Sequence, residues 1–316
     1  MFEIPIAYVF FNRPGVTRDS FELIRKQRPA TLFLVCDAPR ESHPDDKDQV
    51  AESRRIVENI DWPCDVTKLF AEENMGCGLR ISSAISHVLA RFEQLIVLED
   101  DCFADPSFFR YCETLLNRYK ADQRVMAVSG NNFQRGRSRT NASYYFSKYP
   151  HCWGWATWRR AWNHFQLGIP QWPRFRDEGH LAAVCESRRE LNYWTRIFNH
   201  VHEGRSSSWA YPWTLCCWMN HGLTALPNVN LVSNHGFGKQ ATHTMTENNA
   251  SNLPRVSLDR IVHPRQVFRH VAADQYTDNH IFSGDNRRAS PIRRMRHLFQ
   301  SRQSAVNFPP DPRQAA

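Results

Sequence analysis

Short apolar runs alternate with longer periodic segments over the first 130 residues. An unbroken run of about five to eight apolar residues predicts a buried strand, and apolar residues every three or four positions predict a helix with one buried face. We expect strands at 4–14, 30–37, 64–70, 94–98 and 124–130, and helices at 17–29, 44–60, 78–92 and 105–119. This alternation predicts an α/β fold, a mostly parallel sheet with helices on both faces.

Prolines and capping residues mark the ends of several elements. Pro14 is expected to close the first strand, and Thr17 to cap the helix that follows. Asp105 and Pro106 have the residue types favoured at the N-cap and first position of a helix, which places a helix start there.

The pattern is less regular after residue 138 and richer in tryptophan. Trp155, Trp158 and Trp162 have the spacing of a buried helical stripe, so we expect core packing for at least two of them. We predict one domain over residues 1–250, with halves 1–135 and 136–250. A helical extension and basic tail are expected over 251–316.

Composition predicts a globular protein. The chain has 316 residues, 41% of them hydrophobic, and no apolar run approaches the roughly 20 residues of a membrane span. The opening "MFEIPIAYVFF" contains Glu3 and lacks a basic leader, which favours a core strand over a signal peptide. We therefore expect a cytoplasmic location. Nine scattered cysteines without a C-x-x-C pair predict buried free thiols.

The net charge of +8 is concentrated at the C-terminus. Residues 286–316 contain seven arginines and one aspartate, so the rest of the chain is nearly neutral and nucleic-acid binding by the body is not predicted. Residues 290–302 have the pattern of a basic amphipathic helix on an anionic membrane surface, which would attach the protein peripherally to the inner membrane. A solvated tail and a helix packed on a partner are the alternatives.

Three carboxylates, Glu99, Asp100 and Asp101, directly follow the predicted strand at 94–98. Adjacent like charges repel one another and resist burial, so a positive group is expected beside them. In an extended chain Glu99 and Asp101 would share one side and Asp100 would take the other. A divalent cation with a bound diphosphate fits hard carboxylate oxygens. The alternative is that these carboxylates cap the next helix and face solvent.

The acidic cluster shares one predicted edge of the sheet with other polar residues. Ligands of open parallel sheets bind outside the carboxyl ends of the strands. Asn12 and Asp37 also fall at the carboxyl ends of predicted strands, and the loop before the helix at 78–92 faces the same edge. The sequence therefore predicts a binding site at this edge.

The stretch "VLEDDCFADPSFFRYCETLL" resembles the Glu-Asp-Asp motif of GT-A glycosyltransferases, especially the N-acetylglucosaminyltransferase that initiates complex N-glycan branching (N-acetylglucosaminyltransferase I) and its bacterial relatives. Other stretches follow in the same order, and the resemblance covers roughly residues 5–245. They are "FFNRP", "CDAPR", "AVSGNN", "WGWATW", "SSWAYPW" and "NLVSNHGFGKQATHT".

The resemblance implies a GT-A, Rossmann-like fold and a nucleotide-sugar site in the first half. Asp101 would bind Mn²⁺ or Mg²⁺, and Asp100 and Glu99 would reach the ribose or waters around the ion. Asn12 and Arg13 would lie beside the nucleotide.

Further roles follow from the same resemblance. Asp37 would accept a hydrogen bond from the base or ribose. Arg80 would bind the diphosphate or sugar, with a plain surface arginine as the alternative. His243 is a candidate second metal ligand and His235 is its rival. In the second half, tryptophan faces would stack on sugar rings beside Gly154.

The implied activity is metal-dependent transfer of a sugar from a nucleoside-diphosphate sugar, with UDP as the expected nucleotide. The enzyme would be a hexosyl- or N-acetylhexosaminyltransferase that acts on a glycan or lipid-linked acceptor in bacterial surface polysaccharide synthesis. The half 1–135 would bind the nucleotide, and the half 136–250 would bind the acceptor.

One position departs from the family pattern. Inverting members place a catalytic aspartate after the tryptophan of the segment that corresponds to "SSWAYPW", but here Ala210 follows Trp209. The register is shifted, or Glu203 or Glu178 serves as base, or the mechanism is retaining, or catalysis is lost; no base is assigned.

The sequence leaves two alternatives to a transferase activity. A non-catalytic nucleotide-sugar or carbohydrate-binding protein is favoured by Ala210 and opposed by the intact acidic cluster. A sugar-nucleotide pyrophosphorylase is the other alternative. It is opposed by the absence of a glycine-rich loop after the first strand, where only Gly15 occurs.

Overall fold

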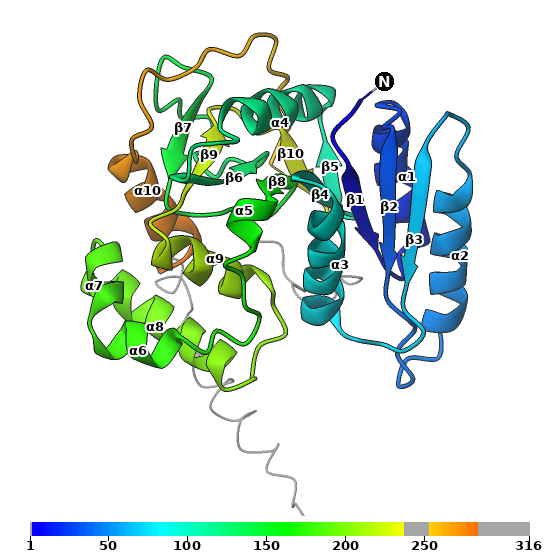
Figure 1. Ribbon diagram of the computed structural model, residues 1–316, viewed down its shortest axis with the longest axis horizontal. Coiled ribbons are helices and arrows are strands. Elements are labelled where there is room, and N and C mark those ends of the chain that lie inside the picture. Colours follow the sequence, from blue (N-terminus) through cyan, green and yellow to red (C-terminus); the bar gives the residue numbers. More distant parts are fainter. Residues whose placement is uncertain (1, 237–252, 284–316) are drawn as a thin grey trace, which may run out of the picture.

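An eight-stranded sheet runs through the computed structural model, which describes residues 2–236 and 253–283 (Figure 1). Strands β3, β2, β1 and β4 pair in parallel; β8 then lies antiparallel between β4 and β6. Next, β9 pairs in parallel with β6, and β7 closes the sheet antiparallel to β9. Along the sheet the strands are β3 Asp65–Phe70, β2 Thr31–Cys36, β1 Ile6–Phe10, β4 Gln94–Glu99, β8 Trp155–Trp158, β6 Val125–Ser129, β9 Leu223–Pro227 and β7 Tyr144–Ser147.

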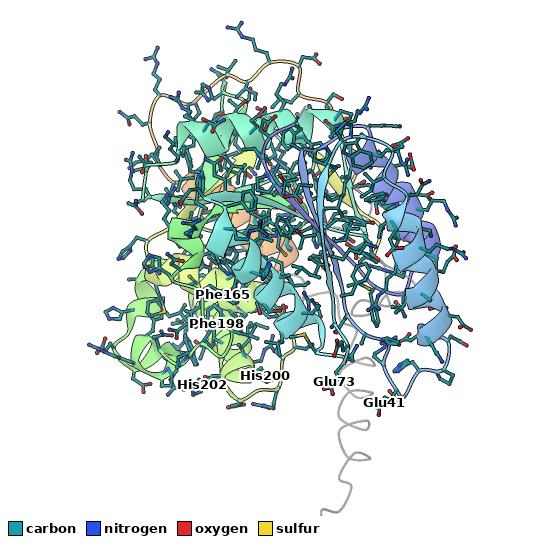
Figure 2. The ribbon with its side chains drawn as sticks, turned by 45° about the vertical axis from the view of Figure 1, so that its right-hand side comes forward. Glu41, Glu73, Phe165, Phe198, His200 and His202 are labelled. Carbon is teal, nitrogen blue, oxygen red and sulfur yellow. The ribbon has the colours of Figure 1, made fainter. Side chains whose placement is uncertain are left out.

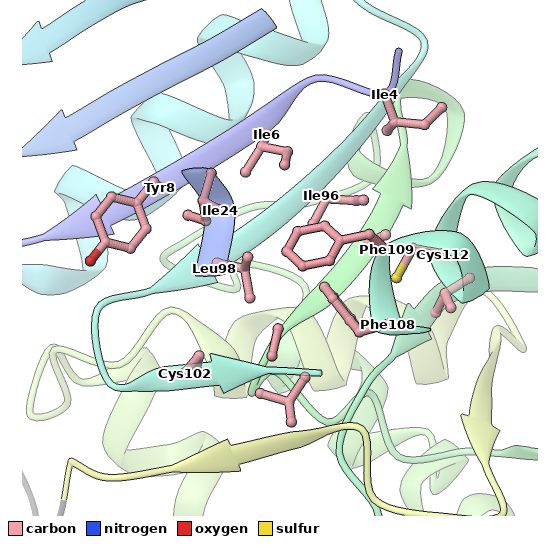
Figure 3. Packing of buried hydrophobic residues seen from close by; sticks show 14 of the residues in the cluster. Ile4, Ile6, Tyr8, Ile24, Ile96, Leu98, Cys102, Phe108, Phe109 and Cys112 are labelled. Atoms are coloured by element: carbon pink, nitrogen blue, oxygen red, sulfur yellow. The ribbon is translucent and has the colours of Figure 1, made fainter. Parts of the chain in front are cut away.

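The helices cover both faces of the sheet, as the sequence predicts. Successive residues of β1 point to opposite faces, so Ile6 and Tyr8 pack with α1, α2 and α4, and Ala7 and Val9 pack with α3 and the later helices (Figures 1 and 3). The predicted α/β class is confirmed. The helices are α1 Pro14–Arg25, α2 Asp46–Glu58, α3 Cys77–Arg91, α4 Pro106–Arg118, α5 Arg159–Trp162, α6 Trp172–Asp177, α7 His180–Val184, α8 Arg188–His202, α9 Ala210–Met219 and α10 Val271–Ile281.

A second, two-stranded sheet lies just after the acidic cluster. Strand β5 Cys102–Ala104 pairs antiparallel with β10 Val232–Asn234. This pairing brings two segments far apart in the sequence to the carboxyl end of β4.

Two helix predictions are wrong in detail. Helix α1 begins at Pro14, without a side-chain cap, because proline is well suited to the first helical position; Thr17 is buried within the helix. Trp155 and Trp158 lie in a strand, and α5 begins only at Arg159. The predicted core packing is confirmed, since Trp155, Trp158 and Trp162 are all buried.

Packing against the β5–β10 sheet leaves no room for a side chain at Gly154. Its φ is +63°, and a Cβ atom there would lie 2.7 Å from Cγ2 of Val232. A side chain at this position would therefore meet the protein core instead of a bound sugar.

The predicted free thiols are confirmed. None of the nine cysteines forms a disulfide, and five are buried. Among the described residues, no helix combines the length and the apolar character that a bilayer crossing requires. The boundary at residue 250, His243 and the predicted membrane helix at 290–302 lie outside the described residues.

Candidate functional site

The predicted site residues at the strand ends lie along one edge of the sheet. Parallel pairing places Val9 opposite Glu99 and Phe10 opposite Cys36, so the chain leaves β1, β4 and β2 side by side. Asn12 and Arg13, the acidic cluster, and Asp37 follow these three strands.

Arg13 supplies the positive charge expected beside the three acids. Its Nη2 atom donates to Oδ1 of Asp100 and, at 3.1 Å, to Oδ2 of Asp101. Burial acts to lower the pKa of Arg13, but the two carboxylates outweigh it and raise this pKa above its ordinary value. The alternating arrangement predicted for Asp100 and Asp101 is wrong, because β4 ends at Glu99 and a turn places both aspartates against the same guanidinium.

The three acids of the cluster outnumber the single positive charge of Arg13, and their environment resists full ionisation. Burial, followed by repulsion from Asp101 and Asp100, raises the pKa of Glu99 to about 8. Burial also raises the pKa of Asp100, although Arg13 opposes the shift. Asp100 is only 3% exposed, and Asp105, not the cluster, caps α4 by accepting from the Ser107 amide. The alternative of a solvated capping cluster is therefore wrong.

The segment after β10 completes the surroundings of Asp101. The Asn234 amide donates to Oδ1 of Asp101 at 3.0 Å, and the backbone N–H of His235 donates to the Asp101 carbonyl at 2.9 Å. A Cβ atom at Gly236 would lie 2.1 Å from Oδ2 of Asp101, so a side chain there would displace the Asp101 carboxylate. The exposed His235 ring stacks on Phe103 with 4.3 Å between ring centroids, beside the cluster.

Asp37 connects two loops at the same edge. Its Oδ1 accepts from the N–H groups of Ala38 and Met75, both at 2.9 Å, and its Oδ2 accepts from Gly76 at 2.8 Å. These bonds hold the loop that enters α3. Contact of Asp37 with a base or ribose stays a prediction.

Arg80 lies in the first turn of α3 and is half-buried. Its Nε is buried without a hydrogen-bond partner among the described residues, and burial lowers the pKa of its guanidinium. Because a buried unpaired donor is costly, Arg80 has the chemistry to receive an anionic ligand.

Sequence reasoning missed a network that fixes Asn12. The Asn12 amide donates to Oδ1 of Asp46 at 2.7 Å, and Nε of Arg40 donates to Oδ2 of Asp46 at 2.6 Å. Arg40 also lies over the Phe11 ring, 5.4 Å from its centroid. The "CDAPR" stretch contains Arg40, but its partner stands at the start of α2, where a solvated acid is the usual expectation.

Acidification is expected to weaken this network. The hydrogen bonds from Arg40 lower the pKa of Asp46 to about 2, and an unfolded aspartate titrates near 3.9. The stabilisation is therefore present above about pH 4 and is lost as pH falls toward 2, at a cost on the order of 2 kcal/mol. We expect the free energy of unfolding, measured with urea, to fall less over this pH range in Asp46→Asn than in the wild type. An equal fall of the unfolding free energy in both proteins would contradict a stabilising role of the Asp46 carboxylate.

The second half contains no assigned base. Ala210 is the first residue of α9, after Trp209. Glu178 is an exposed partner of Arg174 and His180, and Glu203 forms an ion pair with Arg205 at the end of α8. Within residues 2–236 and 253–283, no group of three or more His, Cys, Asp or Glu side chains is placed to hold a metal ion.

Comparison with known proteins gives similar folds at low identity. No model of a protein family matches this chain, and neither does any curated protein. A mannosyltransferase from Pyrobaculum calidifontis, solved with GDP-Man and Mn²⁺, is 12% identical over 68% of this chain and 69% of its own, with a TM-score of 0.36. S. aureus TarS is 10% identical over 71% of this chain and 58% of its own, with a TM-score of 0.40.

A nucleotidyltransferase is similar to the same degree. A UDP-glucose pyrophosphorylase solved with UDP-glucose is 10% identical over 51% of this chain and 78% of its own, with a TM-score of 0.31. At these identities and TM-scores the likenesses support no assignment of activity. The relationship to N-acetylglucosaminyltransferase I stays a prediction.

Proposed function

We propose that this protein is a metal-dependent glycosyltransferase that takes its sugar from a nucleoside-diphosphate sugar. The main support is the acidic cluster at the carboxyl edge of the sheet, in which Asp100 is buried and three carboxyl groups lie near the single positive charge of Arg13. A divalent cation balances such a cluster and also binds a diphosphate, for which Arg80 offers an unpaired donor at the same edge.

The residues present fit a divalent cation. Asp101 supplies a carboxylate oxygen, and His235 is an exposed imidazole beside it. Mg²⁺ and similar ions in nucleotide sites commonly take one or two protein ligands and complete their shell with phosphate and water, so a cluster of three protein ligands is not required. When bound, the cation supplies positive charge against the departing diphosphate.

Each side chain at the edge has a separate task in this proposal. Arg80 donates hydrogen bonds to diphosphate oxygens, Asp37 keeps the loop into α3 in place, and Asn234 orients the Asp101 carboxylate. UDP as nucleotide, a glycan or lipid-linked acceptor, surface polysaccharide synthesis and membrane attachment through 286–316 belong to the same proposal.

A screen of donor nucleotides tests the activity. We expect UDP- or GDP-sugars to raise the melting temperature only with Mn²⁺ or Mg²⁺ present, because the ion and diphosphate bind together. Slow hydrolysis of the bound donor, detected as free sugar, would distinguish a transferase from a non-catalytic binding protein. The non-catalytic alternative is the one that Ala210 favours. The absence of any nucleotide-dependent shift would refute the proposal.

A further inference from the structure

A hollow of about 380 Å³, lined by polar residues, lies along helix α8. Its lining residues on the helix are spaced three or four apart, so they share one face of α8. The opposite face is buried through Trp194 and Phe198. The helix residues of the hollow are Asn192, Thr195, Arg196, Asn199, His200 and Glu203, and Arg205 adds to them from the following loop.

Several hydrogen-bond donors line the hollow. Oδ1 of Asn199 accepts from Nε1 of Trp172 at 2.8 Å and from Nη1 of Arg176 at 3.2 Å, which leaves its amide N–H₂ for a ligand. The carboxylate of Glu203 is paired with Arg205. Arg196 then gives the hollow a net positive charge.

Such a lining selects for acceptor atoms in a ligand. Guanidinium and amide N–H groups bind the oxygens of a phosphate or carboxylate, and charge-assisted bonds of this kind are stronger than neutral ones. A neutral sugar would leave part of this donor capacity unused.

The hollow lies on the same side of the molecule as the candidate donor site. The carbonyl of Ser207, which follows Arg205, would lie 2.4 Å from a Cβ atom at Gly78, so this loop touches the first turn of α3. Arg80 belongs to that turn. Figure 2 shows His200 at the same lower edge as Glu73, which lies in the loop after β3.

We propose that the hollow on α8 binds an anionic group, a phosphate or a carboxylate, carried by the sugar acceptor. This role rests on the proposed glycosyltransferase function. The acceptor would extend from the loop at residues 204–208 along α8, with its charged group beside Arg196 and the amide of Asn199.

Calorimetric titration tests the hollow directly. The probes are tetragalacturonate, inorganic phosphate and neutral maltotetraose, each added to protein saturated with UDP and Mn²⁺ so that the donor edge is filled. We expect an anionic probe to bind and maltotetraose to bind at least about tenfold more weakly. A response to phosphate alone identifies a phosphorylated acceptor, and a response to tetragalacturonate identifies a uronate.

Substitutions then locate the binding. Arg196→Gln is expected to lower the affinity for the anionic probe by about tenfold. Arg55 is an exposed arginine on α2, and Arg55→Gln is expected to leave this affinity unchanged. Equal binding of the neutral probe, or no effect of Arg196→Gln, would overturn the proposal. Binding of UDP with Mn²⁺ is measured in parallel. If UDP does not bind, the transferase function is refuted. If UDP binds normally but no anion binds, only the role of the hollow is refuted.

Discussion

Asp101→Asn is expected to abolish metal-dependent binding of a nucleoside diphosphate, with an affinity loss of at least about a hundredfold. The amide retains an oxygen for the bond from Asn234 but removes the negative charge that a divalent cation requires. Arg13 keeps Asp100 as its partner, so the local fold should persist. The measurement is calorimetric titration of UDP and GDP with and without Mn²⁺.

Asp105→Asn is the matched control for this variant. Asp105 lies in the same connection between β4 and α4, but its carboxylate caps α4 and accepts from Ser107 and Ser257. Asparagine caps a helix about as well as aspartate, so this change should alter stability by less than about 1 kcal/mol and leave nucleotide binding intact. Equal nucleotide affinity in Asp101→Asn and the wild type would remove Asp101 from the metal site.

The first half of the fold follows from hydrophobic periodicity. Strands β1, β2, β3 and β6 fall within the predicted runs, and β4 runs one residue further, to Glu99. Strands β1, β2, β4 and β6 are largely buried and are nearly continuous apolar stretches, whereas the edge strand β3 is only partly buried. Strands β5 and β10 have three residues each, too few to give a period. Strand β8 has the residue pattern of a helix because its tryptophans are three apart and lead directly into α5.

The candidate site was predictable where topology alone places a residue. Asp37 and the acidic cluster follow parallel neighbouring strands, so their common edge could be inferred. The pairing of Arg13 with both Asp100 and Asp101 depends on a turn that no periodic pattern describes. The partner of Asn12 is 34 residues away, and its identity depends on how α2 packs.

A second large effect is expected far from this edge, at a buried ion pair in the second half. Nζ of Lys148 lies 2.6 Å from Oε1 of Glu190, and their side chains are 5% and 1% exposed. Nζ also donates to the Val184 carbonyl at 2.8 Å, and Oε2 of Glu190 accepts from the Glu186 N–H at 2.7 Å. The pair thereby ties the end of β7 to helices α7 and α8.

Lys148→Met is expected to lower the free energy of unfolding by about 3–5 kcal/mol, because it leaves the Glu190 carboxylate buried without its counter-ion. Lys68→Met is the matched control: Lys68 pairs with Glu58 at the same kind of distance, 2.7 Å, but both side chains are about half exposed. That change should cost less than about 1 kcal/mol in urea denaturation.

A second substitution separates the loss of the counter-ion from the loss of packing by the lysine stem. Adding Glu190→Leu to Lys148→Met removes the uncompensated charge, so the double variant should regain part of the lost stability, although the Tyr149 hydroxyl and the Glu186 amide then lose an acceptor. If Lys148→Met were no more destabilising than Lys68→Met, the Glu190 carboxylate would have to be neutral or hydrated in the folded protein, and the connection between β7 and α8 would depend on aromatic packing alone.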